Sequence, residues 1–509
     1  MKIALVGIIK NEAHDILYWL AWHALLGVNS FILFDDDSQD GTRDLIKAAS
    51  LHWDIRLFHV KEHSLDLTEQ SHLNRQRQVY LDALNAIHDQ YDWIGFLDTD
   101  EYAKLHVHQT LTEFLGSMEP DVGAVALHWQ TYGHNGHITT PNLPPFHSFS
   151  RHSTQDEAIN RHVKSFIRPS FWQKDEWVNV HYFPLKKGRY VTSSGQPINW
   201  SSTRGITEDQ PDWSVANLMH FQNRSLEQFV GRARNRKDIQ LLLDKHELTQ
   251  WDEVEDTSPR RDKTVDALHW IKPVITSGTL VALEQIRTQH TPEHGLVPPC
   301  PRYNPTHFKI FALYPKDPRR PGLVNDLLCD TGDPNQPNDD FQLYMLQSQK
   351  YPRAAFLFGL DGSHTIKDFF LLHDSRLSGL PRYDILPVIA ETAIALRQQG
   401  GFACRGQFLC SPPNEPLMPN RMKVALWECF YALPQEMMPS GESWLTLPAF
   451  GLAEMALQSP AFSLKTIAAL TEMDRKTTAW LLPLLALYLN EVQHKELSSH
   501  LGALAPFIL

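Results

Sequence analysis

The sequence has few cysteines, no long apolar run and no excess of positive charge. Its 509 residues include five cysteines, the first at Cys300, and none of them forms a Cys-x-x-Cys pair. A disulfide framework and a zinc ribbon are therefore not indicated, and a reducing compartment, the cytoplasm, fits best. The net charge of −12 argues against nonspecific binding of nucleic acid, which requires a basic face.

The apolar runs are too short to cross a bilayer. The longest, residues 480–489, contains Pro483 and is far shorter than the roughly 20 residues that a spanning helix needs. Residues 1–9 hold one lysine and no small-residue cleavage site, so we interpret them as a strand rather than a signal peptide. We expect no transmembrane segment, which leaves peripheral contact with a membrane open.

The chain does contain a regular alternation of strand and helix signals. Apolar content of 42% and charged content of 21% are typical of a soluble globular protein, and this length predicts two or three domains. Such alternation predicts βαβ units and a mostly parallel sheet. The expected strands are 3–9, 28–34, 55–60, 93–97 and 122–127, and the expected helices are 15–26, 42–49 and 74–86.

The pattern changes after residue 129. Residues 129–212 are rich in loops with short β signals, and a helix is expected at 225–243. Residues 291–340 are rich in Pro, Asn and Asp, as domain boundaries are. From residue 341 the spacing is helical, notably at 385–398, 421–432 and 464–498. We therefore predict an α/β domain over 1–290, a linker over 291–340 and an α-helical accessory domain over 341–509.

Three carboxylates follow the predicted strand 93–97 within four residues. Asp98, Asp100 and Glu101 stand at the strand's end, where open α/β sheets bind ligands. Carboxylates this close repel one another unless a cation neutralises them. Hard oxygen ligands at this spacing suit Mg²⁺ or Mn²⁺ holding a diphosphate.

A second acidic cluster, residues 35–40, follows the predicted strand 28–34. Parallel strands end at the same rim, so the two clusters should converge there. The upstream cluster can accept hydrogen bonds from a base and ribose, while the downstream one holds metal. By itself the upstream cluster favours a solvated turn in which Ser38 or Asp40 caps a helix. Together with the carboxylates after strand 93–97, it favours a nucleotide-binding site.

Both clusters belong to an ordered series of residues that resembles the family 2-like and family 92 glycosyltransferases over roughly residues 1–240. Phe221 stands where the family usually has Tyr, and Arg224 and Arg232 stand where it often has lysines, which puts the acceptor and phosphate contacts in question. The matching positions are Lys10–Glu12, Trp19, His23, Gly27, Phe34–Ser38, Trp93–Tyr102, Trp129, Tyr132–Gly133, Gly136, Arg151, Val163–Ser165, Arg168–Pro169, His181, His220–Phe221, Ser225 and Phe229.

The resemblance implies a GT-A fold that uses a nucleotide-diphosphate sugar, a UDP-sugar foremost, with Mn²⁺ or Mg²⁺. Asp36 would contact the base, and Asp98 the ribose or the metal through water. Asp100 would ligate the metal directly and His220 would complete its coordination.

Further donor contacts are expected from the Lys10, Asn11 and Glu12 turn and from Arg77. Cations can stabilise the charge that develops on the leaving diphosphate, although surface charge is the commoner role of such residues. The cationic candidates are Arg75, Arg77, Lys164 and Arg168.

The resemblance also implies inversion at the anomeric carbon, which needs a carboxylate to deprotonate the acceptor hydroxyl. Glu208 and Asp209, in the loop before His220, are the predicted catalytic residues, with Asp212 and Glu101 as alternatives.

The predicted function is that of a cytoplasmic, metal-dependent transferase that moves a hexose to a saccharide or glycolipid acceptor. One alternative is a nucleotide-sugar-binding scaffold without turnover, whose helical half docks a partner. Metal-dependent phosphoester hydrolysis or nucleotidyl transfer also uses paired carboxylates and remains a third hypothesis.

Overall fold

The computed structural model separates into two compact units, Met1–Ile271 and Lys272–Leu509, which we describe one at a time. The predicted domain bounds of 1–290, 291–340 and 341–509 stay a prediction. The structure describes residues 1–60, 72–141, 143–174, 179–233, 251–292, 307–315, 321–324, 327–330, 341–361, 366–367, 382–387, 398–404, 407–410, 417–421, 429–434 and 448–509.

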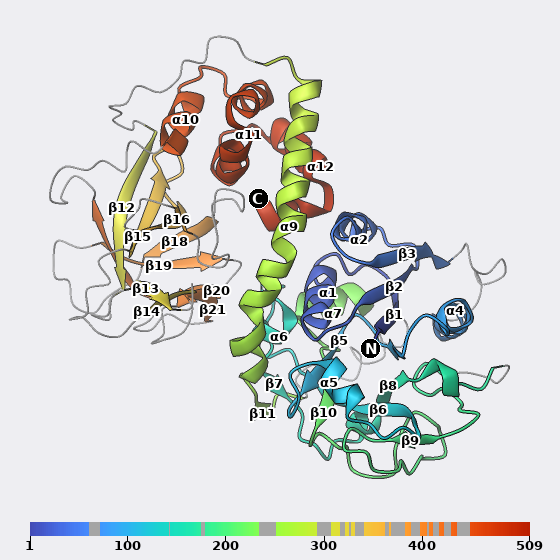
Figure 1. Cartoon of the computed structure of the whole chain (residues 1–509). Coiled ribbons are helices and arrows are strands. Elements are labelled where there is room, and N and C mark those ends of the chain that lie inside the picture. Colours follow the sequence, from blue (N-terminus) through green and yellow to red (C-terminus); the bar gives the residue numbers. More distant parts are fainter. Residues whose placement is uncertain are drawn as a thin grey trace. The chain divides into compact units, whose positions relative to one another are not determined.

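A large mixed sheet with helices packed against it forms the N-terminal unit (Figure 1). In sheet order its strands are β3 (Ile55–His59), β2 (Ser30–Asp35), β1 (Ile3–Ile9), β4 (Trp93–Phe96), β8 (Val163–Ile167), β6 (Val122–Thr131), β10 (Ala216–His220) and β5 (Glu101–Leu105), and β9 (Arg189–Val191) pairs with β6. Strands β3, β2, β1 and β4 are mutually parallel. The sheet becomes mixed where β8 enters antiparallel to both β4 and β6.

The helices of this unit connect and cover these strands. A small second sheet pairs β7 (Arg151–His152) with β11 (Val254–Glu255). The helices are α1 (Ile16–Leu25), α2 (Thr42–Ser50), α4 (His72–Ile87), α5 (Leu111–Gly116), α6 (Pro145–Ser148), α7 (Leu226–Ala233) and the first part of α9 (Ser258–Gln289).

The predicted α/β fold with a large sheet is confirmed, and every strand and helix expected before residue 130 is present within a few residues of its predicted bounds. The predicted helix 225–243 begins as α7, and residues 234–250 lie outside the described part. Strands β5 and β10 were not predicted. They pair with one another, and this pairing sets His220 beside Glu101.

Close packing at the sheet centre depends on Gly95 in β4. A Cβ at this position would lie 2.5 Å from Cε1 of Phe166 in β8 and 2.6 Å from Cδ2 of Leu5 in β1. No real Cβ approaches that closely, so glycine lets both neighbouring side chains pack across β4. The resulting core holds β4 rigidly, and β4 leads directly into Asp98.

The C-terminal unit contains antiparallel strands whose pairing closes on itself. In ring order the strands are β12 (Phe308–Pro315), β15 (Phe341–Ser348), β16 (Ala354–Asp361), β18 (Arg382–Pro387), β19 (Gln398–Cys404) and β22 (Phe430–Pro434), and β22 pairs again with β12. Three further strands extend this sheet, namely β17 (Ile366–Lys367), β20 (Gln407–Cys410) and β21 (Met418–Arg421). A separate pair is formed by β13 (Pro321–Val324) and β14 (Leu327–Asp330).

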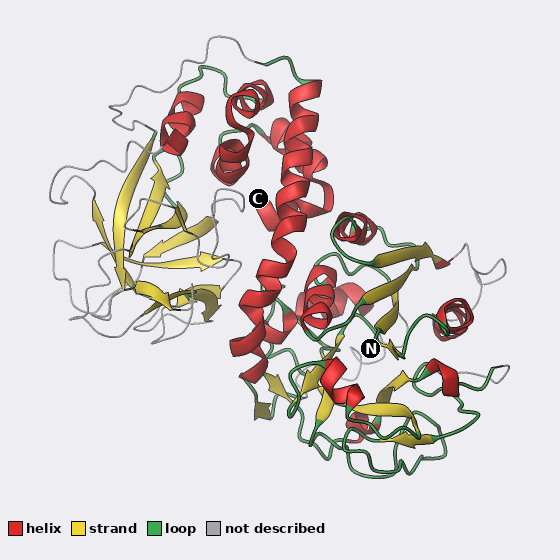
Figure 2. Cartoon of the chain, viewed as in Figure 1, coloured by secondary structure: helices red, strands yellow, loops and turns green. Residues whose placement is uncertain are grey.

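Both faces of these strands are buried. Phe311 and Leu313 belong to one core cluster, whereas Ile310 and Ala312 belong to another that includes Trp480. The second cluster packs the strands against helices, as Figure 2 shows. These helices are α10 (Pro448–Leu457) and α11 (Leu464–Ala486), followed by α12 (Glu491–Leu501) and the short α13 (Ala505–Ile508).

The predicted helical C-terminal region is confirmed over residues 448–509. The expectation that helical spacing continues from residue 341 is wrong at 341–348 and 354–361, which form β15 and β16. The structure describes only the ends of the predicted helices 385–398 and 421–432, and these ends lie in strands β18, β19, β21 and β22. The rest of both ranges lies outside the described residues.

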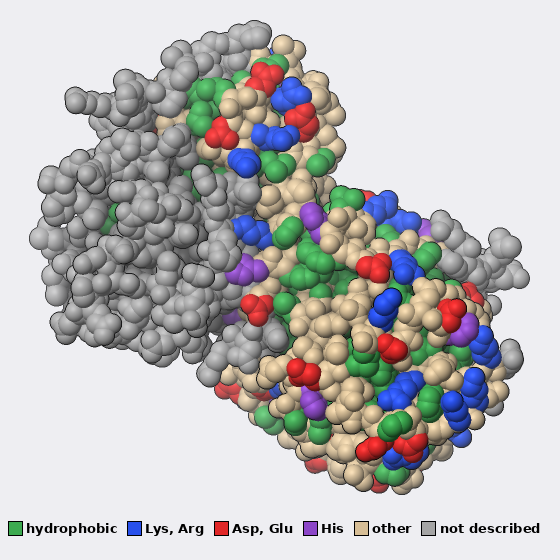
Figure 3. All heavy atoms as spheres, viewed as in Figure 1, with side chains coloured by type: hydrophobic (Ala, Val, Ile, Leu, Met, Phe, Trp, Pro, Cys, Tyr) green, Lys and Arg blue, Asp and Glu red, His purple; other side chains and the backbone are tan. Residues whose placement is uncertain are grey.

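Among the helices that the structure describes, none combines the length and the hydropathy needed to cross a membrane. On the face of the N-terminal unit visible in Figure 3, positive and negative side chains are interspersed.

Candidate functional site

The two acidic clusters follow β2 and β4, two parallel strands that lie on either side of β1. Ile9, the last residue of β1, is in register with Asp35, the last residue of β2. The chain then continues to Asp36, whose N–H donates to Ile9 O at 2.8 Å. Beyond β4, the N–H of Leu97 donates to Val6 O, so Asp98 emerges at the same end of the sheet. The predicted convergence of the clusters at one rim is what parallel pairing produces.

Hydrogen bonds tie the turn after β1 to the loop after β2. The backbone N–H of Asn11 donates to Ser38 Oγ at 2.9 Å, and the N–H of Gln39 donates to Asn11 Oδ1 at 2.8 Å. Asn11 has a φ of 56° and Asp37 one of 60°, a left-handed conformation that Asn and Asp tolerate better than other non-glycine residues. The two predicted donor-binding segments therefore form one continuous surface.

Asp36 lies between two cations of this surface. Lys10 Nζ lies 3.4 Å and Arg75 NH2 2.9 Å from Asp36 Oδ2. Burial opposes ionisation of Asp36, but Arg75 and Lys10 outweigh it and lower its pKa. Arg75 projects from α4, which also carries the partly exposed Arg77.

Asp98 is held by a fully buried lysine. Lys164 Nζ, from β8, lies 2.9 Å from Asp98 Oδ2 and 3.7 Å from Glu101 Oε2. Gln76 and Tyr80 from α4 donate to the other oxygen of Asp98. Lys164 is thus a charged partner of the Asp-x-Asp motif rather than surface charge.

Glu101 faces the interior and is fully buried. Its carboxylate accepts hydrogen bonds from Trp129 Nε1 at 2.7 Å and from the Asp98 N–H at 2.8 Å. Burial raises the pKa of Glu101 well above its ordinary value. Trp19 Nε1 donates to the carbonyls of both Asp98 and Glu101, which fixes this loop from the other side. Glu101 therefore shapes the loop and is unsuited to meet an acceptor.

Asp100 lies between His220 and Arg232. Its Oδ1 is 3.7 Å from His220 Nε2, and its Oδ2 is 3.0 Å from Arg232 NH1. The N–H of Phe221 donates to Asp100 O, which joins the loop to the end of β10. Burial opposes ionisation of Asp100, but His220 and Arg232 outweigh it and its pKa is lowered.

His220 is a neutral imidazole at physiological pH. Burial lowers its pKa to about 4. Its ring packs against Trp129 with centroids 4.2 Å apart, and its buried Nδ1 has no hydrogen-bond partner among the described residues. A neutral imidazole beside a carboxylate is the form in which histidine ligates a metal.

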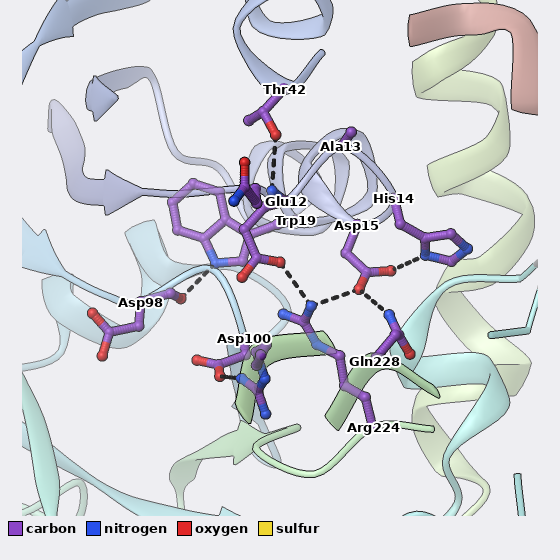
Figure 4. A network of polar contacts seen from close by, with 12 residues as sticks. Glu12, Ala13, His14, Asp15, Trp19, Thr42, Asp98, Asp100, Arg224 and Gln228 are labelled. Carbon is purple, nitrogen blue, oxygen red and sulfur yellow. Dashed lines mark hydrogen bonds and ion pairs between the residues drawn. The ribbon is translucent and has the colours of Figure 1, made fainter. Parts of the chain in front are cut away.

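A second buried ion network, drawn in Figure 4, lies beside Asp100. Arg224 NH1 is 2.7 Å from Glu12 Oε2 and 2.9 Å from Asp15 Oδ2. Asp15 also pairs with His14 and accepts a hydrogen bond from Gln228 at 3.1 Å. Burial opposes ionisation of Asp15, yet Arg224 and His14 outweigh it and lower its pKa to about 2. Asp15 was not predicted as a site residue, and its only signal in the sequence is its position at the start of the expected helix 15–26.

Both arginines retain buried donors without partners. Nε and NH2 of Arg224, and the same two atoms of Arg232, make no hydrogen bond within the described part of the chain. Because buried donors normally find acceptors, these N–H groups are available to an anion or to water. Arg224 and Arg232 replace the lysines expected from the resemblance, and they keep positive charge at this place.

Other predicted residues lie away from these contacts. Arg168 donates to the carbonyls of Pro120 and Met118, which is a structural role. Glu208 and Asp209 are exposed in the loop before β10, and the N–H of Glu208 donates to Asn199 O. Their role as catalytic base stays a prediction.

Comparisons with known proteins agree on one family for the region that carries this site. Residues 8–238 match the model of glycosyltransferase family 92. A family 92 glycosyltransferase protein of Oryza sativa subsp. japonica is 23% identical over 190 residues, which are 37% of this chain and 30% of that protein. Another from Ricinus communis is 24% identical over 234 residues, 42% of this chain and 38% of that protein. The chain thus spans about a third of the length of these relatives.

Solved structures give a weaker likeness. Staphylococcus aureus TarS 1-349 in complex with UDP has 14% identity and a TM-score of 0.22, covering 34% of this chain and 48% of that chain. HddC from Yersinia pseudotuberculosis has 12% identity and a TM-score of 0.23, covering 37% and 90%. We draw nothing about function from scores this low. The resemblance recognised in the sequence is confirmed by the family match: residues 8–238, which contain the whole candidate site, match glycosyltransferase family 92.

Proposed function

We propose that this protein transfers a hexose from a nucleotide-diphosphate sugar, a UDP-sugar foremost, to a saccharide or glycolipid acceptor with inversion. The observation that carries the proposal is the meeting of Asp36, Asp98 and Asp100 at one sheet rim beside buried arginines with unpartnered donors. The family match over residues 8–238 supports the same reaction class.

The surface formed by Lys10, Asn11, Glu12 and Asp36 suits the nucleoside of the donor. Asp36 is ionised and can accept hydrogen bonds from base and ribose, while Lys10 and Arg75 hold it in place. Arg77, on the same helix as Arg75, is a further donor contact in this proposal.

Asp100 and His220 are suited to hold a divalent metal, since the Asp100 carboxylate lies 3.7 Å from the neutral imidazole of His220. The carboxylate of Asp98 is held by Lys164, Gln76 and Tyr80, so it would have to turn toward Asp100 and His220 to ligate the same ion. Oxygen and imidazole ligands suit Mn²⁺, and Mg²⁺ is served by the carboxylates. Such an ion, when bound, acts as a Lewis acid that stabilises charge on the departing diphosphate.

Side chains of the protein can also stabilise the charge on the departing diphosphate. Arg224 and Arg232 can each present two further N–H donors to phosphate oxygens while keeping their carboxylate partners. Lys164 pairs with Asp98 from the buried side. Glu208 and Asp209 remain the proposed bases for the acceptor hydroxyl, and Asp212 is a poorer choice because Thr192, Ser194 and Ser214 already engage its carboxylate.

The test compares wild type with Asp100→Asn in the presence of UDP-sugars, Mn²⁺ and a panel of acceptors. We expect the variant to lose at least about 100-fold in product formation, because a charge-stabilising group of the transition state is removed. Asp121→Asn, which alters an exposed carboxylate paired with Arg189, is the matched control and should keep full activity.

Nuclear magnetic resonance of the product at the anomeric carbon tests inversion. Equal product from wild type and Asp100→Asn would exclude the proposed role of Asp100. Tight UDP binding without product from any acceptor would favour the scaffold alternative, and cleavage at another phosphate would favour hydrolysis or nucleotidyl transfer.

A further inference from the structure

Three potential metal ligands meet in the C-terminal unit, apart from the candidate site. His290 follows the C-terminal end of α9, while Glu496 and His500 lie on α12. One ligand atom from each residue can be chosen so that all three lie within 4.8 Å of one another. All three side chains are partly exposed.

The scaffold that carries the cluster is well fixed. Glu496 and His500 are four residues apart on α12 and so share one helix face. The N–H of His290 donates to Ile286 O at 2.9 Å, which extends the helical turn of α9 to the ligand. Asn490 and Gln493 form a capping box at the start of α12. Helical backbone thus carries the ligand residues on both sides of the cluster.

His290 and Glu496 face each other across the cluster. Nε2 of His290 lies 3.1 Å from Oε1 of Glu496, and no hydrogen bond to this nitrogen is found within the described part of the chain. The nitrogen and the oxygen are therefore close enough to ligate one cation together.

The neighbouring cations are engaged elsewhere. Arg287 pairs with Glu284 and Glu472, and Lys495 pairs with Glu491. The carboxylate of Glu496 therefore has histidine as its ion partner, and its negative charge favours a cation placed between the two histidines.

We propose that His290, Glu496 and His500 bind a divalent transition metal, Zn²⁺ foremost, that cross-links α9 to α12. Two imidazoles and one carboxylate suit Zn²⁺ and are too few oxygens for Ca²⁺ or Mg²⁺. Tetrahedral Zn²⁺ with bonds of roughly 2.1 Å places its ligands about 3.4 Å apart, which side-chain rotation reaches from the present separations. Water completes the fourth position. This proposal is independent of the proposed transferase activity.

Binding of Co²⁺ and Zn²⁺ to the full-length, chelator-treated protein tests the site. The background carries Asp98→Asn and Asp100→Asn, so that ions bound at the N-terminal acidic rim do not contribute. In this background we expect one equivalent of Zn²⁺ to bind and Co²⁺ to give the intense visible absorption of a tetrahedral site.

The variants His290→Gln, Glu496→Gln and His500→Gln should each weaken Zn²⁺ binding by more than about 10-fold, the lower effect of losing even an outer-shell partner. His494→Gln, on the same helix and also partly exposed, is the control and should bind as the background does. Circular dichroism before metal addition shows whether each variant is folded.

No bound equivalent in the background protein would overturn the proposal, as would equal affinity in all four variants. The weak Co²⁺ absorption of an octahedral site, unchanged in the cluster variants, would also overturn the proposal. It would mean that His290 and Glu496 form only an ordinary ion pair. Loss of the absorption in the cluster variants alone supports the proposal, because a merely structural role of these residues would not produce it.

Discussion

The two units both bury a carboxylate beside a histidine or arginine, but they do so for different purposes. In the N-terminal unit Arg224 pairs with both Glu12 and Asp15, and Asp15 also pairs with His14. In the C-terminal unit Glu454 is fully buried, accepts a hydrogen bond from the backbone N–H of His307 and lies 2.6 Å from its Nδ1. The first network leaves arginine N–H donors without hydrogen-bond partners among the described residues, whereas the contact between His307 and Glu454 fastens the start of β12 to α10. We therefore infer a binding site beside the arginines and a structural role for Glu454.

The largest effect is expected from breaking the ion network of Arg224, Glu12 and Asp15. Arg224→Met should lower the free energy of unfolding of the N-terminal unit by about 3–5 kcal/mol, because it leaves Glu12 and Asp15 buried without their cation. Urea unfolding measures the change. Arg189→Met, which removes an exposed ion pair with Asp121, is the control and should have little effect. If both variants lost the same small amount of free energy of unfolding, the buried network would be no more important for stability than the exposed ion pair, contrary to our expectation.

A smaller loss is expected in the C-terminal unit. Glu454→Ala should cost about 1–3 kcal/mol, since the N–H of His307 loses its acceptor in a buried place. Glu454→Gln keeps an acceptor of the same shape and should lose less. If the Gln variant were as unstable as the Ala variant, charge rather than hydrogen bonding would hold this contact, and the two units would be more alike than we infer.

The pH dependence of stability sharpens the comparison further. Arg224 and His14 lower the pKa of Asp15 to about 2 from its ordinary 3.8 against the effect of burial. A lowered pKa contributes stability that is complete above the unfolded pKa and is lost as the pH falls from about 4 to 2, a contribution of roughly 2 kcal/mol. Unfolding measured against pH should show this loss in wild type. Asp15→Asn should flatten the curve over this window, and an unchanged curve would show that Asp15 is not the group responsible.

The smallest effect concerns α12, which carries two of the three proposed zinc ligands, Glu496 and His500. Asn490→Ala removes the side chain that accepts the N–H of Gln493 and should destabilise the start of α12 by about 1 kcal/mol. Amide hydrogen exchange of this helix measures the loss. Asn490→Ser retains a capping oxygen and should exchange like wild type. Faster exchange in both variants would indicate that the amide, rather than the cap, supports the helix.

The N-terminal fold could be predicted because its signals are local. Strand β1 has seven buried residues in a row, and helices with clear spacing separate it from the later parallel strands. The Asp98 and Asp100 motif was likewise visible, because the position of a carboxylate after a strand fixes the rim on which it lies. His220 was expected only from the resemblance to the glycosyltransferase families. Glu101 was harder to place, since the direction of its side chain depended on Trp129 and Lys164 from other strands.

The strands of the C-terminal unit could not be recognised in this way. Ile310 and Ala312 enter one core while Phe311 and Leu313 enter the other, so the alternation of apolar and polar residues that marks a half-buried strand is lost. Only the tertiary structure shows which of two buried faces each residue occupies.

The sequence by itself determined the order of strands and helices up to residue 130 and the acidic residues at their ends, because both follow from neighbours along the chain. The tertiary structure decided which distant charges meet: Arg224 with Asp15, Lys164 with Asp98, and His290 with Glu496. Such contacts depend on how elements far apart in the chain pack, and no local spacing encodes them.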